Sequence, residues 1–195
     1  LGTIFNTDAS LVNCCVQRLY GLGIRKAEAV FYLNDYIREV LLKIGIKEQQ
    51  LKYTPGMGVN LEKFTPQPYP PEHPFRILTI GRIMREKGIG EVLAASDELI
   101  KQIPDLEWHI CGAPEKGEEY WLAEITKRPW IKYHGVLADP GPMYAMVHVT
   151  ITTTYHEGLS TVCIESGACA RPVIGSDIYG VREVISDRIT GFLIS

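Results

Sequence analysis

Short apolar runs alternate with amphipathic stretches through the second half of the chain. The run RILTI, residues 76–80, is typical of a buried strand, and residues 88–103 are predicted to form the helix that follows it. Regular alternation of this kind indicates a parallel sheet with helices on both faces, an α/β architecture. The predicted strands are residues 76–80, 106–112, 131–134, 148–153 and 172–176, and the predicted helices are residues 88–103, 118–126, 140–146 and 161–170.

The first part of the chain has a similar but shorter pattern. A helix is predicted over residues 11–30, because apolar residues recur there at helical spacing. A strand at residues 29–33, a helix at residues 35–44 that stops at Gly45, and a short strand at residues 52–54 follow. The helical apolar positions are Leu11, Val12, Cys15, Leu19 and Leu22.

Six prolines lie from residue 55 to residue 74, with Gly56 and Gly58 near the start of this stretch. Such a stretch sustains neither helix nor sheet, so it is predicted to be a stiff linker between domains. The expected domains are residues 1–54 and 75–195, joined by the linker at residues 55–74. The chain opens on Leu1 and ends on an apolar run, so we expect a piece of a longer protein.

Composition narrows the range of functions. The chain has 195 residues, of which 46% are hydrophobic and 22% are charged, with a net charge of −3 and a pI near 6.0. These values give no reason to expect nucleic acid as a partner. No apolar run is long enough to span a membrane, so a cytoplasmic protein is expected. The cysteines have no metal-site spacing and are expected to be reduced, buried thiols. The alternative is that one of them is a catalytic cysteine. The cysteines are Cys14, Cys15, Cys111, Cys163 and Cys169.

Two charged segments follow predicted strands, at the sheet edge where α/β proteins bind ligands. In GRIMREKG, residues 81–88, Arg82 and Lys87 flank a turn that opens a helix. Two cations beside a helix start suit a diphosphate, with the arginine as a planar fork and the lysine as a point charge. The alternative is a solvated turn in which Arg85, Glu86 and Lys87 pair with one another.

The second segment is HEGLSTVCIE, residues 156–165. Gly158 permits close approach of a ligand to the backbone, and Ser160 is placed to cap the next helix. Glu157 would lie beside that helix start, and Glu165 is placed to accept hydrogen bonds from ribose hydroxyls. Alternatively, Glu157 is an ordinary first-turn acid and Glu165 a surface residue.

A third segment, RPVIGSDIYGVREVISDRITGFL, enters and leaves the last predicted strand. Its exit loop either contacts a sugar or is an ordinary turn in which Gly180 relieves backbone strain. Neither GMG at residues 56–58 nor GLGIRK at residues 21–26 completes a dinucleotide-binding fingerprint, which argues against a Rossmann oxidoreductase.

Taken in order, these segments resemble the GT4 family of retaining glycosyltransferases of the GT-B fold. The resemblance runs through GMGVNLEKFTP, GRIMREKGI, YHEGLSTVCIESGACARPVIGSDIYGVREVI and ITGFL, and Glu157 and Glu165 match the family's E-x7-E motif. It implies the end of an N-terminal domain and most of a nucleotide-binding C-terminal domain. Thr153 and Thr154 stand where many members have Pro-Ser, Ser166 where Ala is usual and Tyr179 where Pro is frequent.

The resemblance also implies roles for individual residues. Arg82 and Lys87 match the pair that holds the donor diphosphate, and Glu157 matches the glutamate near the transferred sugar. The loop that faces sugar and phosphate is matched by Gly158, Leu159 and Ser160. The ribose-binding glutamate is matched by Glu165 and the interdomain glycine by Gly58.

The implied reaction is transfer of a hexose or N-acetylhexosamine from a nucleotide-sugar, with UDP as the expected nucleotide and no metal or cofactor required. LGTIFNTDAS, HEGLSTV and CARPVI are similar to bacterial members that build polysaccharide on polyprenyl-diphosphate carriers. For such enzymes the acceptor is a glycan or lipid-linked sugar, and the protein rests on the inner face of the plasma membrane. The alternatives are a GT-B sugar-nucleotide epimerase or phosphorylase-like enzyme, and a non-catalytic nucleotide-sugar-binding module.

Overall fold

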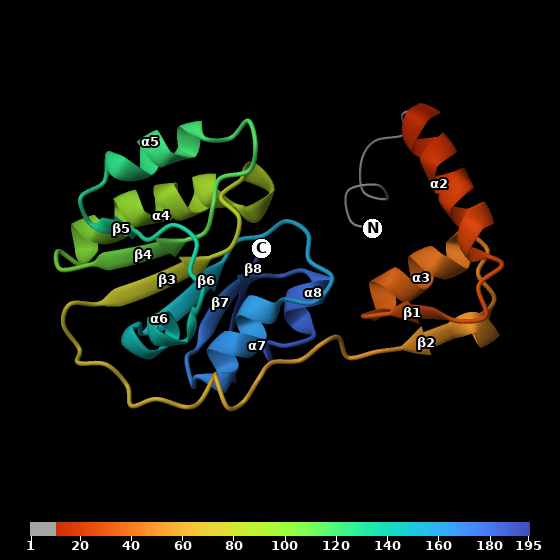
Figure 1. The fold of residues 1–195 in the computed structure, drawn as a ribbon. Coiled ribbons are helices and arrows are strands. Elements are labelled where there is room, and N and C mark those ends of the chain that lie inside the picture. The colour runs from red at the N-terminus through yellow and green to blue at the C-terminus, as the bar shows by residue number, and fades with distance from the viewer. Residues whose placement is uncertain (1–10) are drawn as a thin grey trace.

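The computed structural model describes residues 11–195, with side chains from residue 14 onward. The segment LGTIFNTDAS, which carries part of the finer resemblance, lies outside the described residues, as do the side chains of Leu11 and Val12. Regular structure gathers in an N-terminal unit, residues 11–54, and a C-terminal unit, residues 75–195, with a separate sheet in each (Figure 1). The division into two domains stays a prediction.

The C-terminal unit is built on a six-stranded, fully parallel sheet with the order β5-β4-β3-β6-β7-β8. The chain starts in the middle at β3, builds outward through β4 and β5, and then returns to add β6, β7 and β8 on the other side. The strands are β3 (Arg76–Ile80), β4 (Glu107–Cys111), β5 (Ile131–Tyr133), β6 (Val149–Thr152), β7 (Val173–Ser176) and β8 (Gly191–Ile194).

Helices cover both faces of this sheet, so its strands are apolar on both sides. Ile77 of β3 packs with α4 (Ile89–Gln102) and α5 (Tyr120–Thr126), whereas its neighbour Leu78 packs with α6 (Gly141–Met146) and the end of α7 (Thr161–Ala168). This is the two-residue alternation of a strand between two helical layers (Figure 1). The predicted α/β fold is confirmed.

Two short elements of the C-terminal unit have no counterpart in the predictions. Helix α8 (Tyr179–Arg182) follows β7, and β8 pairs along its whole length with β7. A Cβ on Gly191 would lie 2.2 Å from the carbonyl oxygen of Val173, so only glycine lets the two strands begin their pairing there. The sequence indicated only an exit loop before Gly180 and an apolar run at the end of the chain, because the four residues of α8 are too few to show a helical period.

The N-terminal unit contains α2 (Leu11–Ile24), β1 (Val30–Tyr32), α3 (Asp35–Lys43), a short 3-10 turn (Glu48–Gln50) and β2 (Leu51–Tyr53). The parallel strands β1 and β2 make a two-stranded sheet whose small core includes Leu41. The predicted helix at residues 11–30 was too long, since α2 ends at Ile24. Gly21 and Gly23 weaken its last turn, and the charged residues that follow have no apolar stripe to extend it.

The expectation that all five cysteines are buried was wrong for two of them. Cys111, Cys163 and Cys169 are buried, whereas Cys14 and Cys15 are exposed. They lie on α2, whose apolar residues Leu19 and Leu22 are also 69% and 60% exposed. Helical spacing identified the helix but did not show which side of it would be covered.

The proline-rich segment lies against the C-terminal unit along the edge formed by the beginnings of the strands. The buried guanidinium of Arg171 donates to the carbonyl oxygens of Gln67 and Pro68, at 3.1 and 2.7 Å. Tyr69 donates to the carbonyl of His148, whose ring is 2.9 Å from the carbonyl of Pro71. The segment is therefore fixed by side chains on the C-terminal unit as well as by its own prolines.

No described helix is both long and apolar enough to cross a membrane.

Candidate functional site

The candidate site lies where the chain reverses its direction of sheet growth. Strands β3 and β6 are neighbours, but the connections that follow them lead to opposite halves of the sheet. Parallel sheets bind ligands at such a switch point, beyond the carboxyl ends of the strands. The segment after β3 carries Arg82 and Lys87, and the segment after β6 carries Glu157 and Ser160.

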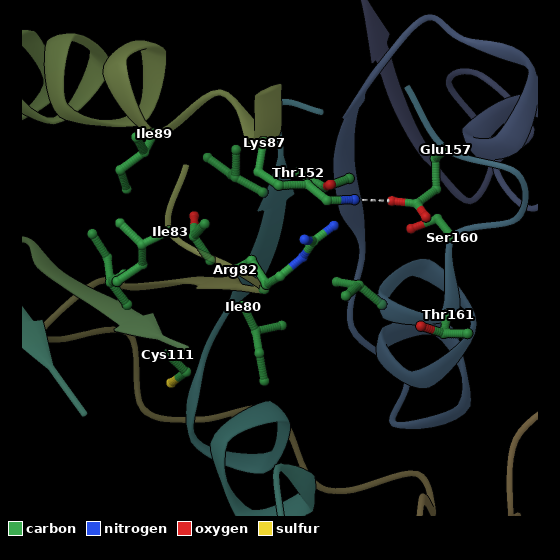
Figure 2. A pocket seen from close by; sticks show the side chains of 15 residues that line it. Ile80, Arg82, Ile83, Lys87, Ile89, Cys111, Thr152, Glu157, Ser160 and Thr161 are labelled. Carbon is green, nitrogen blue, oxygen red and sulfur yellow. Dashed lines mark hydrogen bonds and ion pairs between the residues drawn. The ribbon is translucent and has the colours of Figure 1, made fainter. Parts of the chain in front are cut away.

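Four of the candidate residues line one cavity of about 250 Å3 at this point: Arg82, Lys87, Glu157 and Ser160. Figure 2 shows Arg82 and Lys87 pointing across the cavity toward Glu157 and Ser160. The volume lies just below the roughly 300–1000 Å3 of typical small-molecule sites. The other lining residues are Thr79, Ile80, Gly81, Ile83, Ile89, Ile110, Cys111, Ile151, Thr152, Thr161 and Val162.

Each cation of the cavity has a carboxylate partner from a distant part of the chain. Lys87 Nζ lies 2.5 Å from Glu157 Oε2, and both side chains are about three-quarters buried. Arg82 Nη1 lies 2.6 Å from Glu115 Oε2, and its side chain is 63% exposed. The alternative in which Arg85, Glu86 and Lys87 pair among themselves is therefore wrong for Lys87.

The start of helix α7 forms another wall of the cavity. Ser160 is buried and caps the helix, its hydroxyl accepting from the backbone N–H of Cys163 at 3.4 Å, as predicted. Thr161 and Val162, the first two helical residues, line the cavity. Their N–H groups have no acceptor within the helix, which gives this wall a partial positive charge. Two cations, a helix start and the carboxylate of Glu157 therefore line the same cavity.

Glycine and threonine bring the two segments close together. A Cβ on Gly88, whose φ is +72°, would lie 2.3 Å from the carbonyl oxygen of Thr153. The hydroxyl of Thr153 is 2.9 Å from the carbonyl oxygen of Gly88 and 3.1 Å from that of Lys87. Thr153, one of the departures from the family pattern, thus fastens the start of α4 to the end of β6.

Gly180 does not have the backbone role that was considered for it, and sugar contact by its loop stays a prediction. It is not among the residues with positive φ, so relief of backbone strain is not its role. A Cβ there would lie 2.2 Å from the carbonyl oxygen of Glu157, and its own carbonyl accepts from Ser160 N at 2.9 Å. Gly180 therefore provides space for the loop that carries Glu157.

Glu165 does not line this cavity. Its carboxylate accepts a hydrogen bond of 2.8 Å from the hydroxyl of Tyr144, a fully buried residue of α6. Burial raises the pKa of Tyr144 well above its ordinary value, and the adjacent Glu165 adds to the shift. Glu165 is thus half-buried and held by a tyrosine, neither a plain surface residue nor a wall of the cavity.

Gly158, Leu159 and Gly58 also lie outside the lining. Gly158 lies against the N-terminal unit and Leu159 against the linker, because a Cβ on Gly158 would lie 3.3 Å from Leu33 and one on Gly56 would lie 2.6 Å from Leu159. Gly58 is exposed with φ of +66°, a conformation that favours glycine, and none of the described atoms lies within 4 Å of its Cβ position.

The buried cysteines are poor candidates for nucleophiles. Burial raises the pKa of Cys111 to about 12 and that of Cys163 to about 11, so both are neutral thiols near pH 7.

Sequence reasoning missed Glu115, the partner of Arg82. Its position soon after strand β4 was a usable signal, because all residues after strand ends gather at this edge.

Comparison with known proteins places the chain in a family. The family described as "Glycosyl transferases group 1" matches residues 62–195. The chain belongs to this family. This group 1 glycosyltransferase chain is 23% identical, over 94% of its length and 51% of the relative, to the N,N'-diacetylbacillosaminyl-diphospho-undecaprenol alpha-1,3-N-acetylgalactosaminyltransferase of Campylobacter jejuni. It is 28% identical, over 83% of its length and 45% of the relative, to the putative glycosyltransferase EpsD of Bacillus subtilis.

Solved structures confirm the expected GT-B fold. The complex of Anabaena HepE with UDP and glucose superposes with a TM-score of 0.79 at 18% identity, covering 94% of this chain and 53% of HepE. The pneumococcal O-GlcNAc transferase GtfA, in complex with UDP and GlcNAc, gives a TM-score of 0.75 at 26% identity, covering 90% of this chain and 35% of GtfA. The chain therefore spans about half the length of the curated relatives first compared.

Proposed function

We propose that this chain carries the donor-binding half of a retaining GT4 glycosyltransferase. The enzyme moves a hexose or N-acetylhexosamine from a UDP-sugar to a glycan or polyprenyl-diphosphate-linked acceptor in bacterial polysaccharide synthesis. The observation that carries the proposal is the single cavity that joins Arg82, Lys87, Glu157 and the start of α7. The protein would work in the cytoplasm, against the inner face of the plasma membrane.

Electrostatic stabilisation of the leaving group is the chemistry that this cavity fits best. As the sugar leaves its nucleotide, negative charge builds up on the diphosphate. Arg82, Lys87 and the N–H groups at the start of α7 are the donors available for it, with no metal needed. Loss of one such donor from a transition state costs about 3 kcal/mol of barrier. Family membership is the ground for proposing retention of anomeric configuration.

Glu157 has two roles in this proposal. Its ion pair holds Lys87 at the cavity while the diphosphate approaches, and its carboxylate lies where the hydroxyls of the transferred sugar would bind. Glu165 would accept from the ribose hydroxyls, with Tyr144 fixing its carboxylate. Gly158 and Leu159 belong to the loop around sugar and phosphate, and Gly58 to the connection between domains.

The names of the relatives support the donor and the acceptor. The structures of HepE and GtfA are complexes with UDP and a sugar, which is the ground for UDP here. The Campylobacter jejuni relative is named for a diphospho-undecaprenol acceptor, which favours a lipid-linked acceptor.

The proposal is tested by measuring UDP affinity with calorimetry. Lys87→Ala is expected to weaken UDP binding about 10- to 100-fold, because a charge-assisted hydrogen bond to a phosphate contributes about 1.5–3 kcal/mol. Glu165→Gln, which keeps an acceptor for Tyr144, is expected to weaken binding severalfold. The matched control is Lys101→Ala, since Lys101 is an exposed lysine in the last turn of α4. Unchanged UDP affinity in both site variants would mean that the donor does not bind here.

A further inference from the structure

The side chain of Asn34 connects the N-terminal unit to the loop that carries Glu157. Asn34 is 1% exposed and caps α3, its Oδ1 accepting from the backbone N–H of Ile37 at 2.9 Å. Its Nδ2 donates to the carbonyl oxygen of Gly158 at 2.7 Å. Serine, threonine or aspartate would cap the helix as well, but of these cap residues only asparagine also supplies an amide donor.

The loop contacted by Asn34 sits between two residues of the cavity. Gly158 follows Glu157, the partner of Lys87, and precedes Ser160, the cap of α7. On one side the loop is held by Gly180, which lies against the Glu157 carbonyl and accepts from Ser160 N. On the other side the loop accepts, through the Gly158 carbonyl, a hydrogen bond from Asn34. A shift of this loop would therefore move Glu157 and the start of α7 together.

Apolar and aromatic contacts surround this hydrogen bond. Tyr36 of α3 stacks on Tyr179 of α8, with ring centroids 5.1 Å apart and an interplanar angle of 22°. Leu159 packs against Gly56, and Leu33 packs against Gly158. Figure 1 shows α3 and α8 at the facing sides of the two units. Apolar and aromatic side chains therefore pack around the Asn34–Gly158 hydrogen bond, whose donor side chain is buried. Burial of the donor strengthens such a bond.

We infer that Asn34 is a positioning residue for the donor site: it fixes the 157–160 loop from the N-terminal unit, so that Glu157 and the start of α7 are set for the nucleotide-sugar. This role rests on the proposed function of the cavity. Asn34 itself does not line the cavity, so it acts on the site through the Gly158 carbonyl.

Two variants distinguish the hydrogen bond from Asn34 to Gly158 from the capping of α3 by Asn34. Asn34→Ser keeps a cap oxygen and loses the amide donor, and Asn34→Asp also places a negative charge against the Gly158 carbonyl. Asn60→Asp is the matched control, because Asn60 is exposed and its Oδ1 likewise accepts from a backbone N–H, that of Glu62 at 2.8 Å. Thermal unfolding of each variant verifies that it folds.

The first measurement is hydrogen exchange of residues 157–162 in the ligand-free protein. Both Asn34 variants are expected to exchange these amides about fivefold faster than the wild type and Asn60→Asp, which corresponds to the loss of one net hydrogen bond. Equal protection of the loop in Asn34→Ser and the wild type would overturn the link itself, whatever the donor is.

The second measurement is UDP-sugar affinity by calorimetry. Asn34→Ser is expected to bind about fivefold more weakly than the wild type, and Asn34→Asp more weakly still. Faster loop exchange with unchanged affinity would overturn the positioning role and leave the proposed donor site intact. A wild type that binds no UDP-sugar would overturn the proposed function and this role with it, while the exchange result would still decide whether the link exists.

Discussion

The two units of the chain bury their apolar residues to very different extents. In the C-terminal unit, helices on both faces of a six-stranded sheet enclose Leu78, Trp108 and their neighbours. The N-terminal unit has two strands and a small cluster around Leu41, while Phe31 of β1 is exposed. A two-stranded sheet is marginal by itself in water. The difference indicates that the N-terminal unit depends on contacts outside its own core.

The candidate site, by contrast, depends on both units. The groups that line the cavity come from the C-terminal unit, yet the loop behind them is bonded to Asn34 of the N-terminal unit. The well-packed unit provides the charges, and the sparsely packed unit contacts the backbone that positions them.

The largest expected effect is on the free energy of unfolding, when a buried leucine is replaced by alanine in either core. Leu78→Ala should cost about 4 kcal/mol of unfolding free energy and Leu41→Ala about 2 kcal/mol, because a small cluster collapses more easily around a cavity. All three tryptophans, Trp108, Trp121 and Trp130, lie in the C-terminal unit, so their fluorescence follows that unit during urea unfolding. Only Leu78→Ala should shift the fluorescence transition strongly. A larger shift from Leu41→Ala would erase the contrast between the units.

The next effect concerns the connection between the units. Arg171→Met should lower the unfolding free energy by about 3 kcal/mol, because it removes a buried donor that the carbonyl oxygens of Gln67, Pro68 and Ala145 share. Urea denaturation measures this loss. Arg188→Met is the control, since Arg188 is largely exposed and should shift stability by less than about 0.5 kcal/mol. A neutral Arg171→Met would show that the hydrogen bonds of Arg171 do not hold the segment in place.

The smallest expected effect is pH dependence of the C-terminal unit. Burial, with a contribution from the nearby His134, lowers the pKa of His109 from 6.5 to about 4. The neutral form is thus favoured in the folded state, so its stability contribution is complete above pH 6.5 and is lost as the pH falls toward 4. Between pH 7 and pH 5 the loss should be about 2 kcal/mol.

Fluorescence-detected urea unfolding at the two pH values measures this loss. His109→Gln, which does not titrate, should remove most of the difference, whereas His156→Gln, at an exposed histidine, should retain it. An undiminished difference in His109→Gln would assign the pH dependence to other groups.

The sequence alone determined the main elements and most of the charged residues that line the candidate site. Alternating apolar runs identified the strands from β3 to β7 and the helices between them, because periodicity is a local property that packing reinforces. Arg82, Lys87, Glu157 and Ser160 were found because parallel strands bring the residues after their carboxyl ends to one edge. The Ser160 cap was likewise readable, since a cap depends on residues three positions apart.

Only the tertiary structure decided which of these groups meet. The pairs Lys87–Glu157 and Asn34–Gly158 are separated by 70 and 124 residues, so they depend on strand order and on how the units pack. The same holds for Tyr144 beneath Glu165 and for the exposure of Cys14 and Cys15, which the helical pattern of α2 did not predict. Local patterns fix the period of an element, whereas its neighbours are chosen by long-range packing, which no short window of sequence contains.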